Sequence, residues 1–136
     1  MDLEYEMEFL AVTGVEDKLQ ENVLQTIDDL RQAGISIWML TGDKIETAKC
    51  IAISTGLKTK KEDIKIIAGE TDHLAIEKEI DDYENLTATH MLMIDGTTLS
   101  VIVGDETLSQ KFFNVTQAAK TVCVCRCSPT QKAIVA

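Results

Sequence analysis

The stretch Thr41-Gly42-Asp43-Lys44 places a hydroxyl, a glycine and a carboxylate between an apolar run and a helix-like segment. At a strand-to-helix turn, the hydroxyl can hydrogen-bond a phosphate oxygen, and the glycine lets the backbone approach closely. The first turn of the helix adds unpaired N–H groups with partial positive charge. These features predict a phosphoryl contact. A helix cap is the structural alternative, because Asp43 followed by Glu46 forms a capping-box pattern.

A second candidate loop runs from Arg126 to Lys132. It follows an apolar run at residues 122–125, and Ser128-Pro129 has the pattern of a helix cap followed by proline at the first helical position. If the strands before the two loops are neighbours in a parallel sheet, both loops lie beyond the carboxyl ends of the strands. Lys132 would then place an ammonium group over the phosphate that Thr41 contacts. Without that convergence, Lys132 is an ordinary surface lysine.

The two loops can meet only if strands and helices alternate along the chain. The spacing of the apolar residues predicts such an alternation. We expect strands at residues 7–12, 35–40, 64–68, 91–94, 99–103 and 122–125. We expect helices after a cap at Asp17, ending at Gly34, and then at residues 45–55, at 70–84, along a stripe from Leu108 to Ala119, and from Pro129 onward. Gly96 is interpreted as a turn. This order predicts an α/β fold, with a parallel sheet covered by helices on both faces.

Composition limits the classes of protein that fit. The chain has 136 residues, which suits one domain, and no apolar run approaches the ~20 residues that a membrane-crossing helix needs. No secretory signal opens the chain, so we expect a soluble polypeptide. The net charge of −10 argues against binding to nucleic acid or to an anionic membrane surface, because both need a basic patch. A nucleotide site is still compatible with this net charge, since a few cations close to the site can make the local electrostatic potential positive.

Three of the four cysteines form the run Cys123, Cys125 and Cys127. Residues two apart on a strand are separated by ~6.8 Å, so the three thiols cannot share one zinc ion without breaking the strand. A disulfide between neighbours at this spacing would be strained. We therefore expect no metal site, and instead reduced, buried thiols that face one side of a sheet, as in a cytosolic protein.

Four stretches of the sequence together resemble the phosphorylation domain of the P-type ATPases, and in particular its phospholipid-translocating branch, the flippases. They are residues 14–20, 38–48, 93–99 and 125–132. The stretch at residues 38–48, which contains Thr41-Gly42-Asp43, is shared by P-type ATPases broadly. The amino acids at residues 14–20 and 125–132 are similar to those of flippases in particular. The resemblance implies a haloacid-dehalogenase-like fold, here incomplete, with residues 1–136 as one partial phosphorylation domain.

The resemblance also implies roles for individual residues. Thr41, Gly42 and Asp43 match the turn that contacts phosphate and nucleotide. Lys132 matches the lysine that balances charge on the transferred phosphoryl group, and Arg126 matches an arginine near bound nucleotide. In-line phosphoryl transfer depends mainly on positioning and charge neutralisation, so these residue types suit the chemistry.

The implied parent protein would use ATP and Mg²⁺ to form an aspartyl-phosphate and move a phospholipid between leaflets. This chain lacks the Asp-Lys-Thr-Gly-Thr nucleophile sequence and the Gly-Asp-Gly-x-Asn-Asp metal sequence of the family. We therefore expect it to need no cofactor and to be inactive alone. Asp95 follows the Thr-Gly-Asp turn, whereas the family's nucleophile precedes it, so Asp95-Gly96 is interpreted as a turn.

The partners implied are the nucleotide-binding and actuator domains of the parent, the phospholipid that its membrane domain would carry, and an accessory subunit as a further candidate. The expected location is the cytoplasmic face of a membrane. Two alternatives stay open: a cation-transporting P-type ATPase, and a non-catalytic α/β module that uses the acidic residues near 77–84 to bind a protein.

Overall fold

The computed structural model describes residues 8–14 and 18–136, and within them the chain alternates helices and parallel strands. The strands are β1 (Ile37–Leu40), β2 (Asp63–Ile67), β3 (His90–Asp95) and β4 (Thr121–Cys125). The helices are α1 (Val23–Gln32), α2 (Ile45–Ser54), α3 (His73–Glu84), α4 (Gly96–Gly104), α5 (Glu106–Gln117) and α6 (Pro129–Val135). The predicted α/β class is confirmed.

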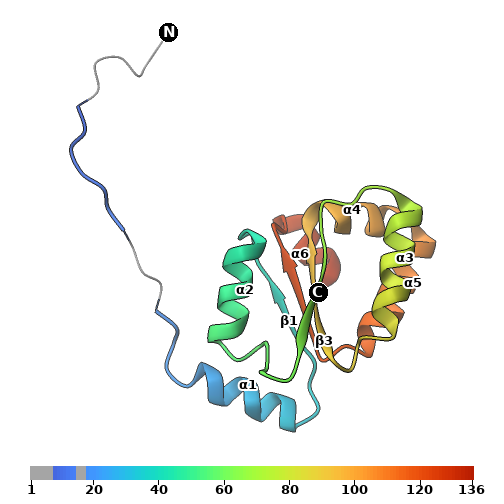
Figure 1. Cartoon of the computed structure of the whole chain (residues 1–136), viewed down its shortest axis with the longest axis horizontal. Coiled ribbons are helices and arrows are strands. Elements are labelled where there is room, and N and C mark those ends of the chain that lie inside the picture. The colour runs from blue at the N-terminus through green and yellow to red at the C-terminus, as the bar shows by residue number, and fades with distance from the viewer. Residues whose placement is uncertain (1–7, 15–17) are drawn as a thin grey trace.

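The four strands form one parallel sheet in the order β1-β4-β3-β2. The chain crosses from β1 to the far edge at β2 and then returns strand by strand through β3 to β4. Connections that run in opposite directions with the same handedness must use opposite faces of the sheet. Accordingly, α1 and α2 lie on one side of the sheet, and α3, α4 and α5 lie on the other (Figure 1).

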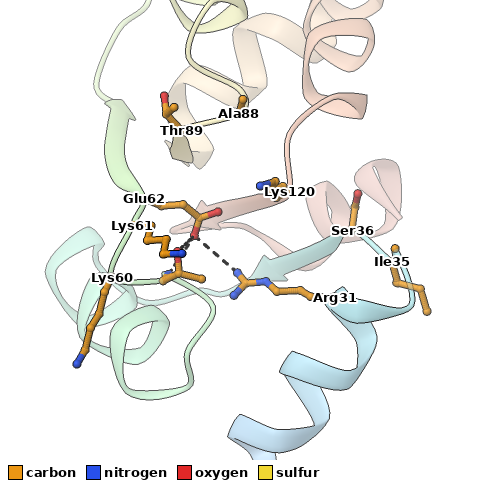
Figure 2. A pocket seen from close by; sticks show the side chains of 11 residues that line it. Arg31, Ile35, Ser36, Lys60, Lys61, Glu62, Ala88, Thr89 and Lys120 are labelled. Atoms are coloured by element: carbon orange, nitrogen blue, oxygen red, sulfur yellow. Dashed lines mark hydrogen bonds and ion pairs between the residues drawn. The ribbon is translucent and has the colours of Figure 1, made fainter.

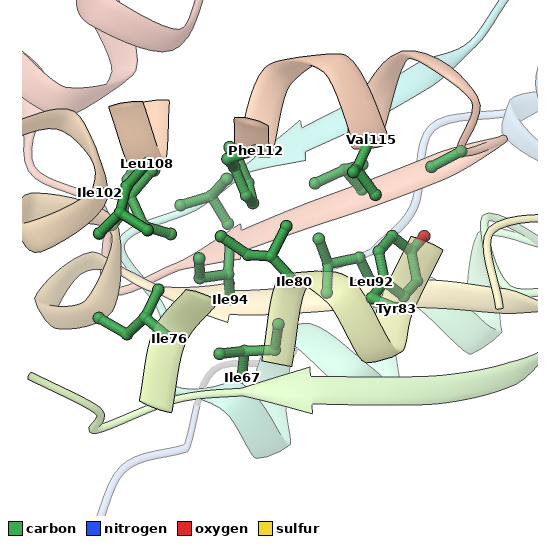
Figure 3. Packing of buried hydrophobic residues seen from close by; sticks show 14 of the residues in the cluster. Ile67, Ile76, Ile80, Tyr83, Leu92, Ile94, Ile102, Leu108, Phe112 and Val115 are labelled. Atoms are coloured by element: carbon green, nitrogen blue, oxygen red, sulfur yellow. The ribbon is translucent and has the colours of Figure 1, made fainter. Parts of the chain in front are cut away.

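Alternating residues of the central strands supply both cores, as expected for strands that are covered on two faces. On the side of α3, α4 and α5, the larger core includes Leu92 and Ile94 of β3 together with Phe112 of α5 (Figure 3). On the side of α2, the smaller core combines Met91 and Met93 of β3 with small or sulfur-bearing residues, which are Ala48, Ala52, Cys123 and Cys125. The small alanines let α2 pack closely against the strands.

The first helix ends as the sequence predicts. Gly34 has a left-handed φ of 78°, its N–H donates to the carbonyl of Arg31, and the N–H of Ile35 donates to the carbonyl of Leu30. This pattern is the Schellman motif, in which a glycine satisfies the last carbonyls of a helix. The helix begins at Val23 after Asn22, and the predicted cap at Asp17 lies outside the described residues.

The strand predicted at residues 99–103 is wrong, because these residues belong to α4. The run is apolar except for Ser100, and such a short run cannot be assigned to a strand or a buried helix by periodicity alone. The side chain of Asp95 decides the outcome by accepting a hydrogen bond from the N–H of Thr98 (2.9 Å), which caps a helix. Leu99 and Ile102, three residues apart, are both fully buried.

The strand predicted at residues 7–12 is not formed by the part that the structure describes. Residues 8–14 have no regular structure and lie away from the sheet (Figure 1). Phe9, Leu10 and Val12 are largely exposed. A strand needs a partner for its backbone groups, and none of the four described strands lies beside this segment.

Tyr83 gives the larger core a measurable pH dependence. Burial, followed by the charge of Glu62, raises the pKa of Tyr83 from 10.0 to about 12. Between these values the unfolded chain loses the phenol proton while the folded chain keeps it, so the free energy of unfolding should fall by about 1.4 kcal/mol per pH unit. Urea unfolding across this range should show a shallower pH dependence for Tyr83→Phe. Identical slopes in the two proteins would contradict the assignment.

Candidate phosphate-binding site

The two loops singled out in the sequence are joined directly, because β1 and β4 are neighbouring parallel strands. Their carboxyl ends therefore lie at the same edge of the sheet. The N–H of Arg126 donates to the carbonyl of Asp43 (2.9 Å), and the N–H of Cys127 donates to the carbonyl of Thr41 (2.9 Å). These two bonds join the loops just past the ends of the strands. The first loop cannot shift without moving the second.

Thr41 and Asp43 form a local hydrogen-bonded turn. The hydroxyl of Thr41 donates to a carboxylate oxygen of Asp43 (2.7 Å) and accepts from the N–H of Asp43 (3.1 Å). The capping box expected at Asp43 and Glu46 is not formed, since Lys44 is the cap residue of α2 and provides no side-chain bond. The Asp43 carboxylate is bound instead to the threonine hydroxyl, and the first N–H groups of α2 receive no side-chain cap.

Arg126 is held in a left-handed conformation, with φ at 48°. Such a conformation is uncommon for a residue other than glycine, and here the bond to Asp43 maintains it. Gly96 makes the conformation sterically feasible, because a Cβ atom at this position would lie 2.4 Å from the carbonyl oxygen of Arg126. Gly96 is thus required by the close approach of two backbones, which the sequence-based interpretation as a turn did not identify.

Lys132 lies on α6, which is anchored to α4 by Gln131. The Gln131 amide donates to the carbonyl oxygen of Gly96 (2.6 Å) and to the hydroxyl of Ser100 (2.7 Å). Ser128 and Gln131 also form a complete capping box at the start of α6. Two independent sets of bonds therefore fix the direction of the helix that carries Lys132. The Ser-x-x-Gln spacing is a capping-box signature that could have identified Gln131 in the sequence.

Lys132 also lies within electrostatic reach of Cys127. Burial raises the pKa of the Cys127 thiol, and the positive charge of Lys132 acts in the opposite direction. The backbone of Cys127 is in turn bonded to Thr41 in the first loop. The structure thus brings Thr41, Asp43 and Arg126 together at the ends of β1 and β4, and α6 starts from the same edge.

Asp95 contributes to this edge as a structural residue. It is 5% exposed, caps α4, and accepts a second hydrogen bond from the N–H of Gly69 (3.2 Å). The expected Asp-Gly turn is therefore a helix N-terminus. A cavity of about 250 Å³ lies beside it, and its lining residues are Ile45, Glu46, Ala68, Gly69, Asp95 and Arg126. Both oxygens of Asp95 already accept hydrogen bonds from the backbone.

The cysteines behave largely as predicted. All four are free, and Cys123, Cys125 and Cys127 are buried. The sulfur atoms of Cys123 and Cys125 are 3.6 Å apart, and this hydrogen bond together with burial raises the pKa of Cys123. Only these two thiols face the α2 side, because Cys127 lies past the end of β4 and packs into the opposite core. The expectation that all three face one side is wrong.

The described residues do not complete a magnesium site. Among them, no group of three or more His, Cys, Asp or Glu side chains is placed to hold a metal ion. The hydroxyl and cationic side chains at the edge suit a phosphate rather than a metal.

Comparison with known proteins decides the family. No protein-family model matches the chain. It is 42% identical over 134 residues to the phospholipid-transporting ATPase NEO1 of Saccharomyces cerevisiae, which covers 98% of this chain and 11% of that protein. It is 44% identical over 131 residues to the probable phospholipid-transporting ATPase IIB of Homo sapiens, covering 96% of this chain and 11% of that protein. The chain is homologous to one segment of the phospholipid-transporting ATPases.

The homology confirms the flippase resemblance seen in the motifs. A relative from Caenorhabditis elegans, the probable phospholipid-transporting ATPase tat-5, is 38% identical over 131 residues. The chain spans only about a tenth of the length of these relatives, with 11% of NEO1 and 12% of tat-5. In the part of the chain that the structure describes, no helix has the length and apolar character needed to cross a bilayer.

Proposed function

We propose that this chain is part of the phosphorylation domain of a phospholipid-transporting P-type ATPase. The observation that carries the proposal is the pair of backbone hydrogen bonds that joins the Thr41 loop to the Arg126 loop at one edge of a parallel sheet. In sheets of this kind, ligands bind beyond the carboxyl ends of the strands. The homologous ATPases supply the reaction class. The whole protein would hydrolyse ATP through an aspartyl-phosphate and transfer a phospholipid between leaflets.

In this proposal, the chain's residues bind and neutralise the phosphoryl group. The Thr41 hydroxyl now donates to Asp43, and it would redirect that hydrogen bond to a phosphate oxygen when the ligand arrives. Lys132 and Arg126 would balance negative charge on the phosphoryl group and the nucleotide. Gly42 would leave room for close approach of the phosphate. Charge neutralisation and hydrogen bonding of this kind are the main source of catalysis in phosphoryl transfer.

The nucleophile and the ligands for Mg²⁺ would come from segments that this chain does not contain. The family's nucleophile sequence is absent from residues 1–136, and the described residues assemble no metal-ligand cluster. Among the described strands β1 lies at an edge of the sheet, and its four residues are only half-buried while β4 is fully buried, which is consistent with an incomplete sheet. ATP and Mg²⁺ thus belong to the proposed whole protein, on the cytoplasmic face of its membrane, together with the nucleotide-binding and actuator domains and any accessory subunit.

The two alternatives are weaker. The relatives reported above are phospholipid-transporting ATPases, which disfavours a cation-transporting parent. Two of the acidic residues near 77–84, Glu77 and Asp81, form ion pairs with Lys111 on α5. These carboxylates therefore hold α3 against α5 and are less available to a partner, which disfavours the acidic interaction module.

Phosphate binding by the chain itself tests the proposal. Inorganic phosphate, followed by amide NMR shifts, should perturb residues 41–43 and 126–132, because the proposal puts the anion between these two loops. The double variant Thr41→Ala, Lys132→Ala should weaken this response by about tenfold or more, the loss expected for charge-assisted hydrogen bonds. The pair Thr107→Ala, Lys49→Ala removes the same residue types at exposed positions and should leave it unchanged. An equal response in all three proteins would refute the assignment of the site.

A further inference from the structure

A cavity lined by residues of the described part of the chain lies at the opposite end of the sheet from the phosphate-binding site. Its volume is about 790 Å³, which falls in the range typical of small-molecule pockets. Ser36, Glu62, Thr89 and Lys120 line it, and each immediately precedes the first residue of a different strand. The cavity therefore spans the amino ends of all four parallel strands (Figure 2). It shares no lining residue with the loops at residues 41–43 and 126–132.

The lining is strongly basic in a chain that is acidic as a whole. Four of the chain's 13 Lys and Arg residues line this cavity, against one of its 23 Asp and Glu residues. The basic residues are Arg31, Lys60, Lys61 and Lys120. The net charge of −10 argued against a basic patch. However, the net charge says nothing about how the Lys and Arg side chains are distributed over the surface. The fold collects them from α1, from the loop before β2 and from the turn before β4.

The single acid of the lining is already neutralised. Glu62 is 7% exposed, and one of its oxygens accepts from the N–H and the hydroxyl of Thr59 (3.0 and 2.9 Å). The same oxygen lies 3.9 Å from the guanidinium of Arg31. Arg31 in turn donates to the carbonyls of Gly56 and Leu57 and to the hydroxyl of Thr121. Glu62 and Arg31 therefore stabilise the loops around the cavity, and their charges are already paired.

Two lysines remain available to a ligand. Arg31 is not available to a ligand, because its guanidinium donates to the carbonyls of Gly56 and Leu57 in the loop after α2. Lys61 and Lys120 are different, because their ammonium groups make no ion pair or hydrogen bond with the described residues. Lys60 also lines the cavity, but its side chain extends away from Arg31 (Figure 2).

We propose that this cavity binds a phosphate ester through Lys61 and Lys120. Lysine is a point-charge ligand that suits the several oxygens of a tetrahedral phosphate, and the two lysines line the cavity from separate loops. The exposed hydroxyl-bearing residue Ser36 lies on a third side of the same cavity. The volume exceeds that of a phosphate alone, so the cavity has room for the organic part of the ester. Both a soluble ester and the head group of an anionic lipid provide this chemistry, and experiment can distinguish these sources.

The test follows amide NMR shifts of the whole chain with two kinds of probe. Glycerophosphate represents the soluble ester, and phosphatidylcholine vesicles with or without phosphatidic acid represent the membrane source. Binding should shift the amides of Ser36, residues 59–62, Thr89 and Lys120. Shifts at residues 41–43 and 126–132 report on the other site, so failure of one proposal is distinguishable from failure of the other. Because the chain is acidic overall, attraction to anionic vesicles requires a local basic site.

Matched lysine variants separate the cavity from general charge effects. Lys61→Gln, Lys120→Gln should weaken the response at least about tenfold, the loss expected for two charge-assisted contacts. The control Lys49→Gln, Lys78→Gln makes the same charge change at exposed lysines on α2 and α3, and should retain it. A response to either probe that only the cavity variant loses supports the proposal and identifies the source. Cavity amides that respond to neither probe, or equal losses in the two variants, would overturn it.

Discussion

Replacing Phe112 by alanine is expected to lower the free energy of unfolding by about 3–5 kcal/mol, the loss typical of a buried phenylalanine. Phe112 lies on α5 and is 1% exposed within the larger core (Figure 3). Its ring packs edge-on against that of Phe113, with centroids 5.4 Å apart and an interplanar angle of 75°. The substitution would remove this contact and leave a cavity between α5 and the sheet. Urea unfolding followed by circular dichroism measures the loss.

Phe9 provides the matched control, because it is the same residue type at 79% exposure. Its replacement by alanine should change the free energy of unfolding by less than about 0.5 kcal/mol, as is usual for surface substitutions. Comparable losses at the two positions would mean that Phe112 is not in the core of the folded chain. A change in the denaturant slope of Phe112→Ala would show instead that the compactness of the folded or unfolded state had changed.

The spacing of apolar residues predicted a helix or a strand correctly wherever the residues in the pattern are also the buried ones. The stripe of Leu108, Phe112 and Val115 predicted α5, and all three side chains are buried on one face of that helix. The near-continuous apolar run before Thr41 predicted β1, a strand of a parallel sheet. The same reasoning failed at residues 99–103, where β-branched residues form α4. There a single carboxylate, that of Asp95, supplies the cap that selects the helix.

The candidate site was predictable as a set of residues but not as a set of contacts. The position of Thr41 after a strand and before a helix is readable from local sequence. The pairing of β1 with β4 joins segments far apart in the sequence, so the local pattern could not predict it. The sequence indicated only that the two loops would meet if these strands were neighbours. The requirement for glycine at position 96 follows from the carbonyl of Arg126, 30 residues further along the chain. The basic cavity is equally non-local, since its lining comes from loops before all four strands.

The proposed role of Lys132 predicts the largest kinetic effect. In a chimera that carries this chain in place of the matching segment of NEO1, Lys132→Ala should slow formation of the acid-stable phosphoenzyme from labelled ATP by about 10²–10³-fold. That magnitude is typical for loss of one group that stabilises charge in a transition state. The rate is compared with that of the unsubstituted chimera. The substitution leaves the hydrogen bonds through which Gln131 anchors α6 unchanged.

Lys49→Ala is the control for this measurement, because it removes a lysine from the exposed face of α2 and should leave the rate within about twofold, as for other surface substitutions. A structural role of Lys132 and a role in charge neutralisation predict different results for Lys132→Arg, which keeps the charge but changes its geometry. If Lys132 only supported α6, arginine at this position should restore the full rate. If its ammonium group contacts the phosphoryl group, arginine should restore only part of the rate, while the thermal stability of the chimera stays unchanged. A full rate in Lys132→Ala itself would exclude Lys132 from the chemistry.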